Sequence, residues 1–378
     1  MAEISTGLGG QLTIDLGALA RNWRALDTVS AGALTSAVVK ADAYGTGIVA
    51  ASKALAAAGA QFFFTATVDE ALAVRAAVPK SHIFVLNGLY PGAANLYVRQ
   101  NLMPVISSMA MLEEWLAKCV ERNEAFPAVL HFDTGMNRLG FRLNEAALVR
   151  QRIDQLGYAP QMIMSHLACA DQPNHEKNRT QLALFQSVLT HFPKIPASLA
   201  NSAGLMTGRD YHFQMVRPGI ALFGGRAVVG RRNPMAHVAT LEVPILQVKD
   251  ARTGETVGYG ANQTLVRDSK LAIIALGYAD GFFRHLSSSN TRPGGKVWLR
   301  GKLCPVVGRV SMDLTIIDIT ELGPDNLPLP GEGVEVFGPH ISVDDQADAA
   351  GTIGYEVLTA MKAGRYVRRY VGDESTAV

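Results

Sequence analysis

The segment "SAVVKADAYGTG", residues 36–47, places a lysine at the end of an apolar, β-branched run. The run is typical of a buried strand, and Lys40 comes just before a short segment bounded by glycine. A lysine there can lay its stem along an apolar surface and keep its charge in water. It can also be a desolvated amine with a lowered pKa, prepared for Schiff-base chemistry with a carbonyl substrate or with pyridoxal phosphate (PLP). The residue type alone leaves both alternatives open.

Other polar side chains follow similar apolar runs. His166 follows "QMIMS", and Arg217 precedes the Pro-Gly pair of "MVRPGIALFG". A lone histidine is more often a hydrogen-bonded residue near the core, and an arginine before Pro-Gly is often part of a surface turn. However, Gly219 also permits close approach of the backbone to a phosphate group. The corresponding positions of other runs hold Tyr44, Thr67, Asn87, Ser107, Asp133 with Arg138, and Asn201 with Ser202, of which the last two are also ordinary helix N-cap residues.

Eight short apolar runs alternate with helical patterns between about residues 35 and 224. Uninterrupted apolar strands are typical of a parallel sheet that is buried on both faces. Eight such β/α units predict a TIM (β/α)8 barrel, with a doubly wound sheet as the alternative. In a TIM barrel the carboxyl ends of the strands form one rim, so the polar residues above would meet there. The runs are "SAVVK", "QFFFTAT", "HIFVLNG", "LMPVISS", "AVLHFDT", "QMIMSHL", "ASLANSA" and "MVRPGIALFG".

The pattern changes after "FGGRAVVGRRNP". From about His237 onward, strands alternate with turns marked by glycine and proline, as in "LEVPILQVKDARTGETVGYG" and "KVWLRGKLCPVVGRVSMDLTIIDI". This predicts a smaller β-rich domain that is closed by one helix near residues 355–363. We therefore expect two domains, at residues 1–235 and 236–378, with a boundary in the region 228–239 and with contacts from an N-terminal strand to the second domain.

The composition favours a protein that acts on small molecules. The chain has 378 residues, nearly half of them apolar, and a formal net charge of +2 without long charged blocks. Neither nucleic acid nor a membrane surface is expected as a partner. Its three cysteines lack a paired spacing, and no secretory signal or spanning segment is visible, which favours the cytoplasm. No Cys/His cluster of the metal-binding type occurs, so no metal is predicted. The cysteines are Cys119, Cys169 and Cys304.

Ten motifs together resemble the alanine racemase family. "AVVKADAYGTG" looks like the PLP-attachment segment of these enzymes, and the other motifs follow in the family's order over nearly the whole chain. The resemblance implies a PLP-binding TIM barrel, a β-rich C-terminal domain and a homodimer. The remaining motifs are "ATVDEALAVR", "HFDTGMNRLGF", "SHLACAD", "ANSAGL", "VRPGIALFG", "GETVGYGA", "GYADGF", "GRVSMD" and "TIGYEVL".

Racemisation needs two groups, because a proton leaves Cα on one face and another returns on the opposite face. By resemblance Lys40 is one of these groups and Tyr259 is the other, with Tyr259 entering the active site of the partner subunit. A tyrosine with an ordinary pKa near 10 is a poor base. His166 matches the family histidine that hydrogen-bonds the tyrosine. Without the resemblance, Tyr259 would be read as a strand aromatic packed on the domain core.

The resemblance also implies ligands for the cofactor and the substrate. Arg217 matches the arginine at the PLP pyridine nitrogen, where a permanent donor keeps that nitrogen unprotonated and weakens the electron sink. Arg138 and the backbone of Met312 match groups that hold the substrate carboxylate, and Arg138 also lies near the phenolic oxygen of the cofactor. The phosphate-binding positions correspond to Tyr44, Ser202, Gly219, Ile220 and Tyr355.

The chain departs from the family pattern at four positions. His131 stands where many members have a lysine, often carbamylated, whose negative charge orients the arginine equivalent to Arg138. A histidine supplies no carbamate, so either another anion such as chloride occupies the space or Arg138 is placed differently. The other departures are Thr46 and Ser198 at positions of common histidines and Ser311 at that of a common cysteine.

Three other functions remain open at the level of sequence. A short PLP-carrier barrel shares the lysine motif but lacks a second domain and a counterpart of Tyr259. An amino-acid decarboxylase on the same architecture has a longer chain and a cysteine-containing motif that we do not find. A serine or broad-spectrum racemase differs only in the packing of its pocket, because an apolar pocket discriminates weakly against one extra hydroxyl.

Overall fold

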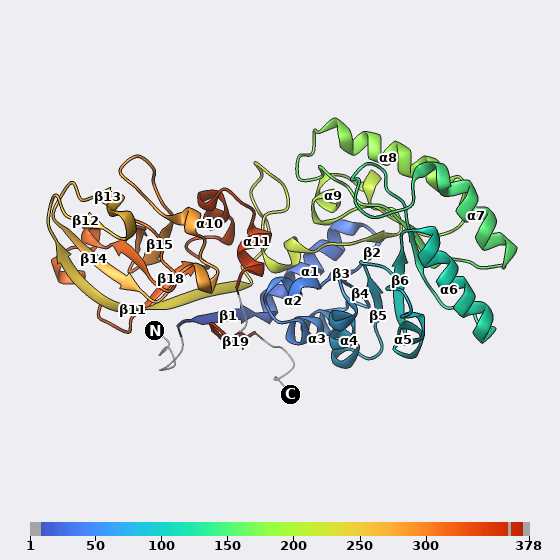
Figure 1. The fold of residues 1–378 in the computed structure, drawn as a ribbon, viewed down its shortest axis with the longest axis horizontal. Coiled ribbons are helices and arrows are strands. Elements are labelled where there is room, and N and C mark those ends of the chain that lie inside the picture. Colours follow the sequence, from blue (N-terminus) through green and yellow to red (C-terminus); the bar gives the residue numbers. More distant parts are fainter. Residues whose placement is uncertain (1–8, 362–363, 373–378) are drawn as a thin grey trace.

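The computed structural model describes residues 9–361 and 364–372. Figure 1 shows a barrel with helices around it, a sheet-rich region beside it, and strands β1 and β19 running between them. Strands and helices alternate along residues 34–216, whereas residues 239–337 consist mainly of strands and short 3₁₀ turns. This is the architecture expected from the sequence.

Seven parallel strands form a curled sheet in chain order, from β3 to β9. Strand β10 (Met215–Val216) pairs in parallel with β2 (Leu34–Thr35). The N–H of Arg217 donates to the carbonyl of Ala200 at 2.9 Å, and that of Val38 donates to the carbonyl of Pro218 at 3.0 Å. These bonds place β10 between β9 and the β2–β3 segment, so the sheet closes as a TIM barrel. The seven strands are β3 (Ala37–Val38), β4 (Phe62–Thr65), β5 (His82–Val85), β6 (Leu102–Ile106), β7 (Val129–His131), β8 (Met162–Met164) and β9 (Ala197–Ser198).

Helices follow the barrel strands, and several of them begin at polar caps. Thr67 caps α4, Ser108 caps α6 and Asn201 caps α9, so several polar residues after the apolar runs serve helix starts. Helix α6 buries one face, including Trp115, against the core. The helices of this region are α1 (Leu16–Ser30), α2 (Lys40–Tyr44), α3 (Ile48–Ala58), α4 (Val68–Ala77), α5 (Ala94–Arg99), α6 (Met109–Arg122), α7 (Ala146–Gln155), α8 (Glu176–Leu189) and α9 (Ser202–Thr207).

Strand length differs from the prediction in the last apolar run. Only the first two residues of "MVRPGIALFG" form a strand, and Ile220–Phe223 form a 3₁₀ helix that ends at Gly224 with φ 80°. Pro218 lacks an N–H and interrupts the ladder, so the chain turns at this point. The segment is apolar because it is buried, which sequence periodicity does not distinguish from a buried strand.

The second sheet is built around the long strand β11 (Ala239–Ala251). Strand β1 (Gln11–Asp15) pairs antiparallel with β11 and parallel with β19 (Val367–Val371), so both ends of the described chain join this sheet. A separate two-stranded hairpin, β12 (Thr256–Val257) with β13 (Gln263–Thr264), projects from it. The remaining strands are β14 (Ser269–Ile274), β15 (Lys296–Leu299), β16 (Lys302–Pro305), β17 (Thr315–Asp318) and β18 (Gly333–Phe337).

The helix predicted near residues 355–363 is present but shorter, and a second helix before it was not predicted. Two helices occur, α10 (Val343–Ala350) and α11 (Gly354–Thr359), and residues 362–363 lie outside the described part of the chain. Ser342 and Asp345 form a capping box at the start of α10, and Gly351 ends it in a left-handed conformation. These are recognisable signals in "SVDDQADAAG". Within residues 9–361 and 364–372, no helix has the length and apolarity needed to span a membrane.

Candidate active site

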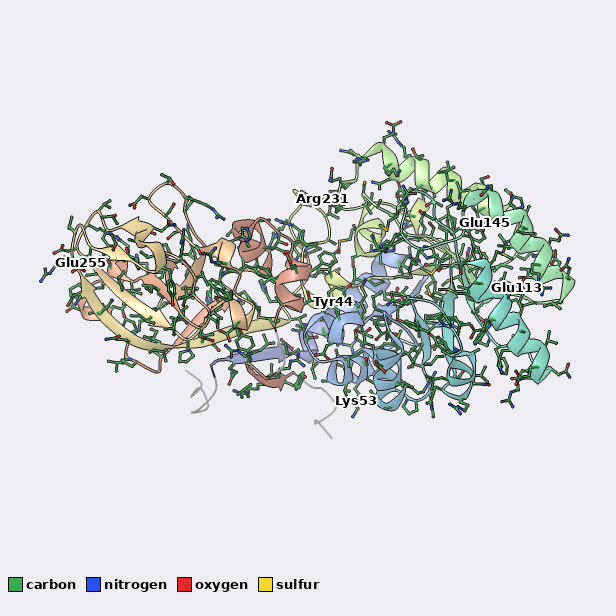
Figure 2. The ribbon with its side chains drawn as sticks, viewed as in Figure 1. Tyr44, Lys53, Glu113, Glu145, Arg231 and Glu255 are labelled. Carbon is green, nitrogen blue, oxygen red and sulfur yellow. The ribbon has the colours of Figure 1, made fainter. Side chains whose placement is uncertain are left out.

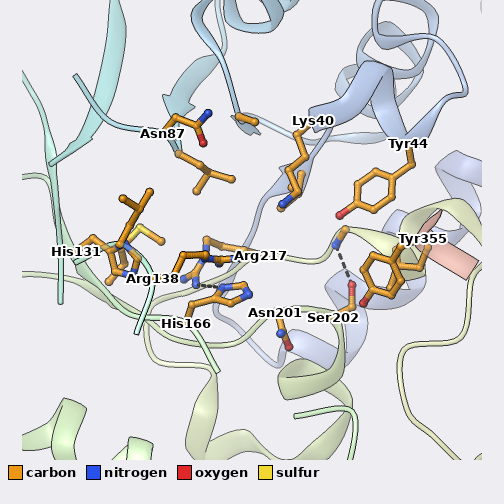
Figure 3. Close-up of a pocket in the computed structure, with 17 residues that line it drawn as sticks. Lys40, Tyr44, Asn87, His131, Arg138, His166, Asn201, Ser202, Arg217 and Tyr355 are labelled. Carbon is orange, nitrogen blue, oxygen red and sulfur yellow. Dashed lines mark hydrogen bonds between the residues drawn. The ribbon is translucent and has the colours of Figure 1, made fainter. Parts of the chain in front are cut away.

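A cavity of about 260 Å³ opens where the barrel strands end (Figure 3). It gathers polar side chains from separate strand–helix connections of the barrel together with Tyr355 from α11. Figure 3 shows the amino end of Lys40 pointing into this space, toward Arg217. The cavity is lined by Val38, Lys40, Tyr44, Ala66, Leu86, Asn87, His131, Arg138, Leu139, Met164, His166, Asn201, Ser202, Arg217, Gly219, Ile220 and Tyr355.

Lys40 begins a turn of unusual handedness. The four residues that follow it, Ala41–Tyr44, all have φ between 53° and 55°, although none of them is glycine. A left-handed conformation costs about 1–2 kcal/mol for each such residue, so the surrounding structure has to hold it. Strained backbone of this kind concentrates at functional sites. The turn directs the chain from the end of β3 across the mouth of the barrel.

Two side chains of the turn help to hold it. Asp42 accepts the N–H of Ile48 at 2.8 Å and forms an ion pair with Arg368 of β19 at 2.7 Å. The hydroxyl of Thr46 donates to the carbonyl of Ala43 at 2.6 Å. Thr46 is a departure from the family pattern, and its hydroxyl thus has a local role in the turn.

Burial lowers the pKa of the Lys40 amine, and the positive charge of Arg138 lowers it further, while the carboxylate of Glu70 opposes both effects. Arg138 is exposed but lines the cavity. A lysine with a lowered pKa has a larger fraction of neutral, nucleophilic amine at neutral pH. This environment favours the second of the two alternatives that the sequence leaves open for Lys40.

Backbone donors converge beside Lys40. The N–H groups of Gly219 and Ala221 point at the hydroxyl oxygen of Ser202, at 2.8 and 3.4 Å. A Cβ at Gly219 would lie 2.2 Å from the hydroxyl oxygen of Tyr44, so a side chain has no room there. Burial raises the pKa of Tyr44 and, to about 12, that of Tyr355, so both hydroxyls stay protonated as hydrogen-bond donors.

Arg217 is buried, with 3% of its surface exposed. Its guanidinium donates to the carbonyl of Ser165 at 2.6 Å, to that of Leu199 at 3.3 Å and to the hydroxyl of Ser198. Burial lowers its pKa to about 9. All of these acceptors are neutral, and neither Arg217 nor Arg138 forms an ion pair with any described residue. Ser198, a departure from the family pattern, therefore contacts Arg217 directly.

Two histidines of the cavity are kept neutral. Burial lowers the pKa of His131 to about 4, with a further contribution from the charge of Arg217. Burial and the same charge hold the pKa of His166 well below its usual range. Arg217 lies 3.4 Å from Nδ1 of His166, and since a guanidinium only donates, Nδ1 accepts and Nε2 carries the proton.

Two residues expected at the site do not line this cavity. Tyr259 lies in a 3₁₀ turn between β12 and β13 and has 72% of its surface exposed. Met312, in the loop before β17, has 54% exposed. Both belong to the sheet-rich region, where the described residues leave more than half of each side chain exposed. Among the strand-end residues, Thr67, Ser107 and Asp133 also lie outside the cavity lining, and Asp133 instead accepts the N–H groups of Gly135 and Met136 to form a turn.

Some lining residues were not singled out from the sequence. Leu86 and Leu139 are apolar residues that a sequence pattern assigns to the core, so periodicity offered no signal for them. Glu70 does not line the cavity, but it accepts a hydrogen bond from the backbone next to Lys40, and the sequence analysis did not single it out either. Its signal was the spacing Thr67-x-x-Glu70, which predicts a capping box and nothing further.

Comparison with known proteins shows which family the chain belongs to. The family described as "Alanine racemase, N-terminal domain" matches residues 14–227, and "Alanine racemase, C-terminal domain" matches residues 238–370. This chain belongs to the alanine racemase family. The predicted family and the predicted barrel fold are thereby confirmed.

Curated relatives align along nearly the whole chain. An alanine racemase of Rhizobium meliloti (strain 1021) is 47% identical over 96% of this chain and 97% of its own length. A protein of Agrobacterium fabrum named "Alanine racemase, biosynthetic" is 46% identical over 96% of this chain and 93% of its own. Another from that organism, named "Alanine racemase, catabolic", is 42% identical over 98% of this chain and 94% of its own.

Solved structures share the fold over the same extent. The alanine racemase of Bartonella henselae, with covalently bound pyridoxal phosphate, superposes with a TM-score of 0.90 at 36% identity, covering 96% of this chain and 99% of that one. The alanine racemase of Streptomyces coelicolor A3(2) has a TM-score of 0.88 at 34% identity, covering 97% and 99%. Figure 2 shows the side chains on this framework, with Tyr44 lying where the barrel meets the sheet-rich region.

Proposed function

We propose that this chain is a PLP-dependent racemase that interconverts L-alanine and D-alanine. The observation that carries the proposal is the single cavity where Lys40, a group of backbone and hydroxyl donors, and two arginines meet. It lies in a chain that shares 47% identity with a protein named alanine racemase. Lys40 binds the cofactor covalently, in keeping with the covalently bound pyridoxal phosphate of the Bartonella henselae enzyme.

The residues around the cavity fit PLP in their chemistry. The tight approach of Gly219 to Tyr44 and the N–H groups gathered at Ser202 suit a phosphate, which needs close backbone donors. Arg217 uses its two terminal nitrogens on protein acceptors, and its Nε–H has no acceptor among the described residues. The proposed cofactor ligands are Lys40, Tyr44, His166, Ser202, Arg217, Gly219, Ile220 and Tyr355, with Arg138 near the phenolic oxygen.

Bound PLP supplies an electron-withdrawing ring that makes the Cα–H of the substrate acidic. Arg217 sets the strength of this effect. Even when lowered to about 9, its pKa lies above neutrality, so the guanidinium would donate a hydrogen bond to the ring nitrogen and keep its own proton. A weaker electron sink favours prompt return of a proton to Cα over reprotonation at another carbon.

Two groups move the proton at Cα from opposite faces. Lys40 is one of them, because its lowered pKa makes the neutral, proton-accepting amine more accessible than that of an ordinary lysine. The partner subunit's Tyr259 is the other. His166 assists it: with Nδ1 facing Arg217, the Nε2–H is free to donate to the tyrosine oxygen and stabilise the deprotonated hydroxyl.

The substrate carboxylate is held by charge and by a backbone donor. Arg138 lines the cavity and has no carboxylate partner among the described residues, so it is available to an anionic substrate. The N–H of Met312 has no acceptor in the described part of the chain and is the proposed second ligand, contributed by the partner subunit.

We infer that the functional unit is a homodimer with active sites shared between subunits. The support is that Tyr259 and Met312 are exposed and lie outside the cavity of their own chain. A monomer would lack the second proton-transfer group. We also propose the domain division at residues 1–235 and 236–378, with β1 crossing to the second sheet, and a cytoplasmic location, in which the three free cysteines remain reduced.

Racemase activity and the PLP lysine can be tested together. Purified protein is expected to racemise L-alanine, and borohydride reduction is expected to fix PLP on the peptide that contains Lys40. Serine and other L-amino acids, assayed in parallel, test the alternative of a broader specificity. A label on Lys53 or Lys80 would overturn the site, and a faster reaction with serine than with alanine would overturn the substrate assignment.

A further inference from the structure

A carboxylate from the neighbouring strand–helix unit holds the peptide that follows Lys40. Glu70 lies in the first turn of α4, directly after β4. One of its oxygens accepts the N–H of Ala41 at 2.6 Å, and the other accepts the N–H groups of Ala66 at 2.8 Å and Thr67 at 3.3 Å. One side chain therefore joins the backbone next to Lys40 to the carboxyl end of β4.

This contact exceeds what the start of α4 requires. In the capping box of α10, the one described residue from which Asp345 accepts is Ser342, its own cap residue, through the backbone N–H and the hydroxyl. Glu70 makes the equivalent bond to Thr67 with one oxygen, and its other oxygen serves Ala41, which belongs to α2. Because α4 does not use this second oxygen, the contact calls for another explanation.

The strained turn after Lys40 supplies that explanation. Ala41 is the first of the four left-handed residues, and its N–H is the donor that enters the turn. Hydrogen bonds to a charged carboxylate are the stronger ones, so Glu70 is suited to fix the point where the chain changes hand. The position of that point determines where the Lys40 side chain leaves the backbone.

Glu70 also acts on Lys40 through its charge. The other charged or titratable groups around the cavity are Arg138, His131, His166 and Arg217 on the barrel connections, Tyr44 on the turn itself and Tyr355 on α11. Burial and Arg138 disfavour the ammonium form, and Glu70 is the carboxylate that opposes them. On the other side of the turn, Asp42 is paired with Arg368.

We propose that Glu70 is a positioning residue for Lys40, which fixes the left-handed turn and supplies the negative charge beside the lysine amine. This inference rests on the proposed role of Lys40 as the PLP lysine. It predicts that loss of the carboxylate changes both the proton affinity of the amine and the rate at which the amine reaches the cofactor.

The test measures covalent loading of PLP onto PLP-free protein, by absorbance, as a function of pH. Glu70→Gln is expected to lower the pH midpoint of loading, because an opposite charge near the amine is lost. Its plateau rate is expected to fall several-fold. Asp69→Asn removes the same charge from an exposed side chain of the same helical turn and is expected to match the wild type in both respects.

Glu70→Asp separates charge from reach and remains informative if Glu70→Gln fails to fold. It keeps the carboxylate but withdraws it from Ala41, so the wild-type midpoint with a reduced plateau is expected. A Glu70→Gln midpoint equal to that of Asp69→Asn, or a Glu70→Asp midpoint lowered as far as that of Glu70→Gln, would overturn the proposal. Peptide mapping after borohydride reduction distinguishes failure of the PLP-site assignment from failure of the Glu70 proposal. A label on another lysine would show that Lys40 is not the PLP lysine. A label on Lys40 with an unchanged midpoint would contradict only the role of Glu70.

Discussion

Replacement of Ser198 by alanine tests how Arg217 is held. The hydroxyl of Ser198 donates to the carbonyl of Met215 at 2.6 Å and accepts from the guanidinium of Arg217. Because its proton is used on Met215, the oxygen is left to face Arg217 as an acceptor. Ser198 is fully buried, and Met215 and Arg217 are each at least 95% buried, so bulk water does not replace the lost partner.

The expected loss of stability follows from these two bonds. A hydrogen bond to a charged group contributes about 1.5–3 kcal/mol, and a buried carbonyl left without a donor costs about 1–3 kcal/mol. Allowing for partial relaxation, Ser198→Ala should lower the free energy of unfolding by about 3 kcal/mol. Ser165→Ala is the matched control, because Ser165 is equally buried at the next strand end and bonds the neutral hydroxyl of Thr134 at 2.8 Å. We expect it to cost about 1 kcal/mol.

Equilibrium urea unfolding of the PLP-free variants, followed by tryptophan fluorescence, measures the difference. Trp115 is buried where α6 packs against the barrel, so its fluorescence reports the unfolding of this domain. Equal destabilisation by Ser198→Ala and Ser165→Ala would refute the reasoning. It would mean that the hydrogen bond from the charged Arg217 to Ser198 contributes no more to stability than a bond between two neutral hydroxyls.

Three further predictions concern the proposed phosphate site at Gly219, the pH dependence of stability and the assembly of the homodimer. Gly219→Ala should weaken PLP binding at least about tenfold, because its Cβ would overlap the hydroxyl of the buried Tyr44. Gly208→Ala is the control and should bind PLP as the wild type does, because the nearest atom to its added Cβ is 4.0 Å away. The pKa of His131 is lowered to about 4 in the folded state, so the unfolded chain binds the proton more readily, and the free energy of unfolding should fall as the pH drops from about 6.5 to 4. His131→Asn should remove up to about 3 kcal/mol of this pH-dependent loss of stability. Parallel plots of stability against pH for the wild type and the variant would contradict this prediction. Subunit exchange between inactive Lys40→Ala and Tyr259→Phe homodimers should restore about a quarter of the wild-type activity, because half of the dimers are mixed and each has one intact site; no recovery after verified exchange would exclude a shared site.

The ends of the barrel strands were predictable from the sequence because the fold itself aligns them. Once alternating apolar runs indicate a parallel barrel, the residues after Val38, Met164 and Val216 must meet at one rim. Lys40, His166 and Arg217 were found in this way from types and positions. Their partners across the cavity required the family resemblance, since Tyr355 comes from a helix far along the chain.

The backbone of the lysine turn was not predictable by pattern. "KADAY" contains no glycine, and alanine and tyrosine are ordinary helix residues, so propensity gives no sign of four left-handed residues. The conformation depends on contacts from other elements, including Glu70 on α4 and Arg368 on β19. For the same reason the sequence shows Glu70 only as a helix cap.

Burial explains why His131 can stand at a family lysine position without adding a positive charge to the cavity. The cavity holds Lys40, Arg138 and Arg217, and no acidic side chain lines it within the described part of the chain. Protonated histidines would add like charges to this group, but burial and Arg217 keep His131 and His166 neutral. Apart from Glu70 beside the lysine turn, the compensating negative charge is left to the proposed ligands, a phosphate near Gly219 and a carboxylate at Arg138. Binding an anionic cofactor and an anionic substrate therefore relieves the repulsion among these cations, and a cavity built in this way discriminates against ligands that lack both charges.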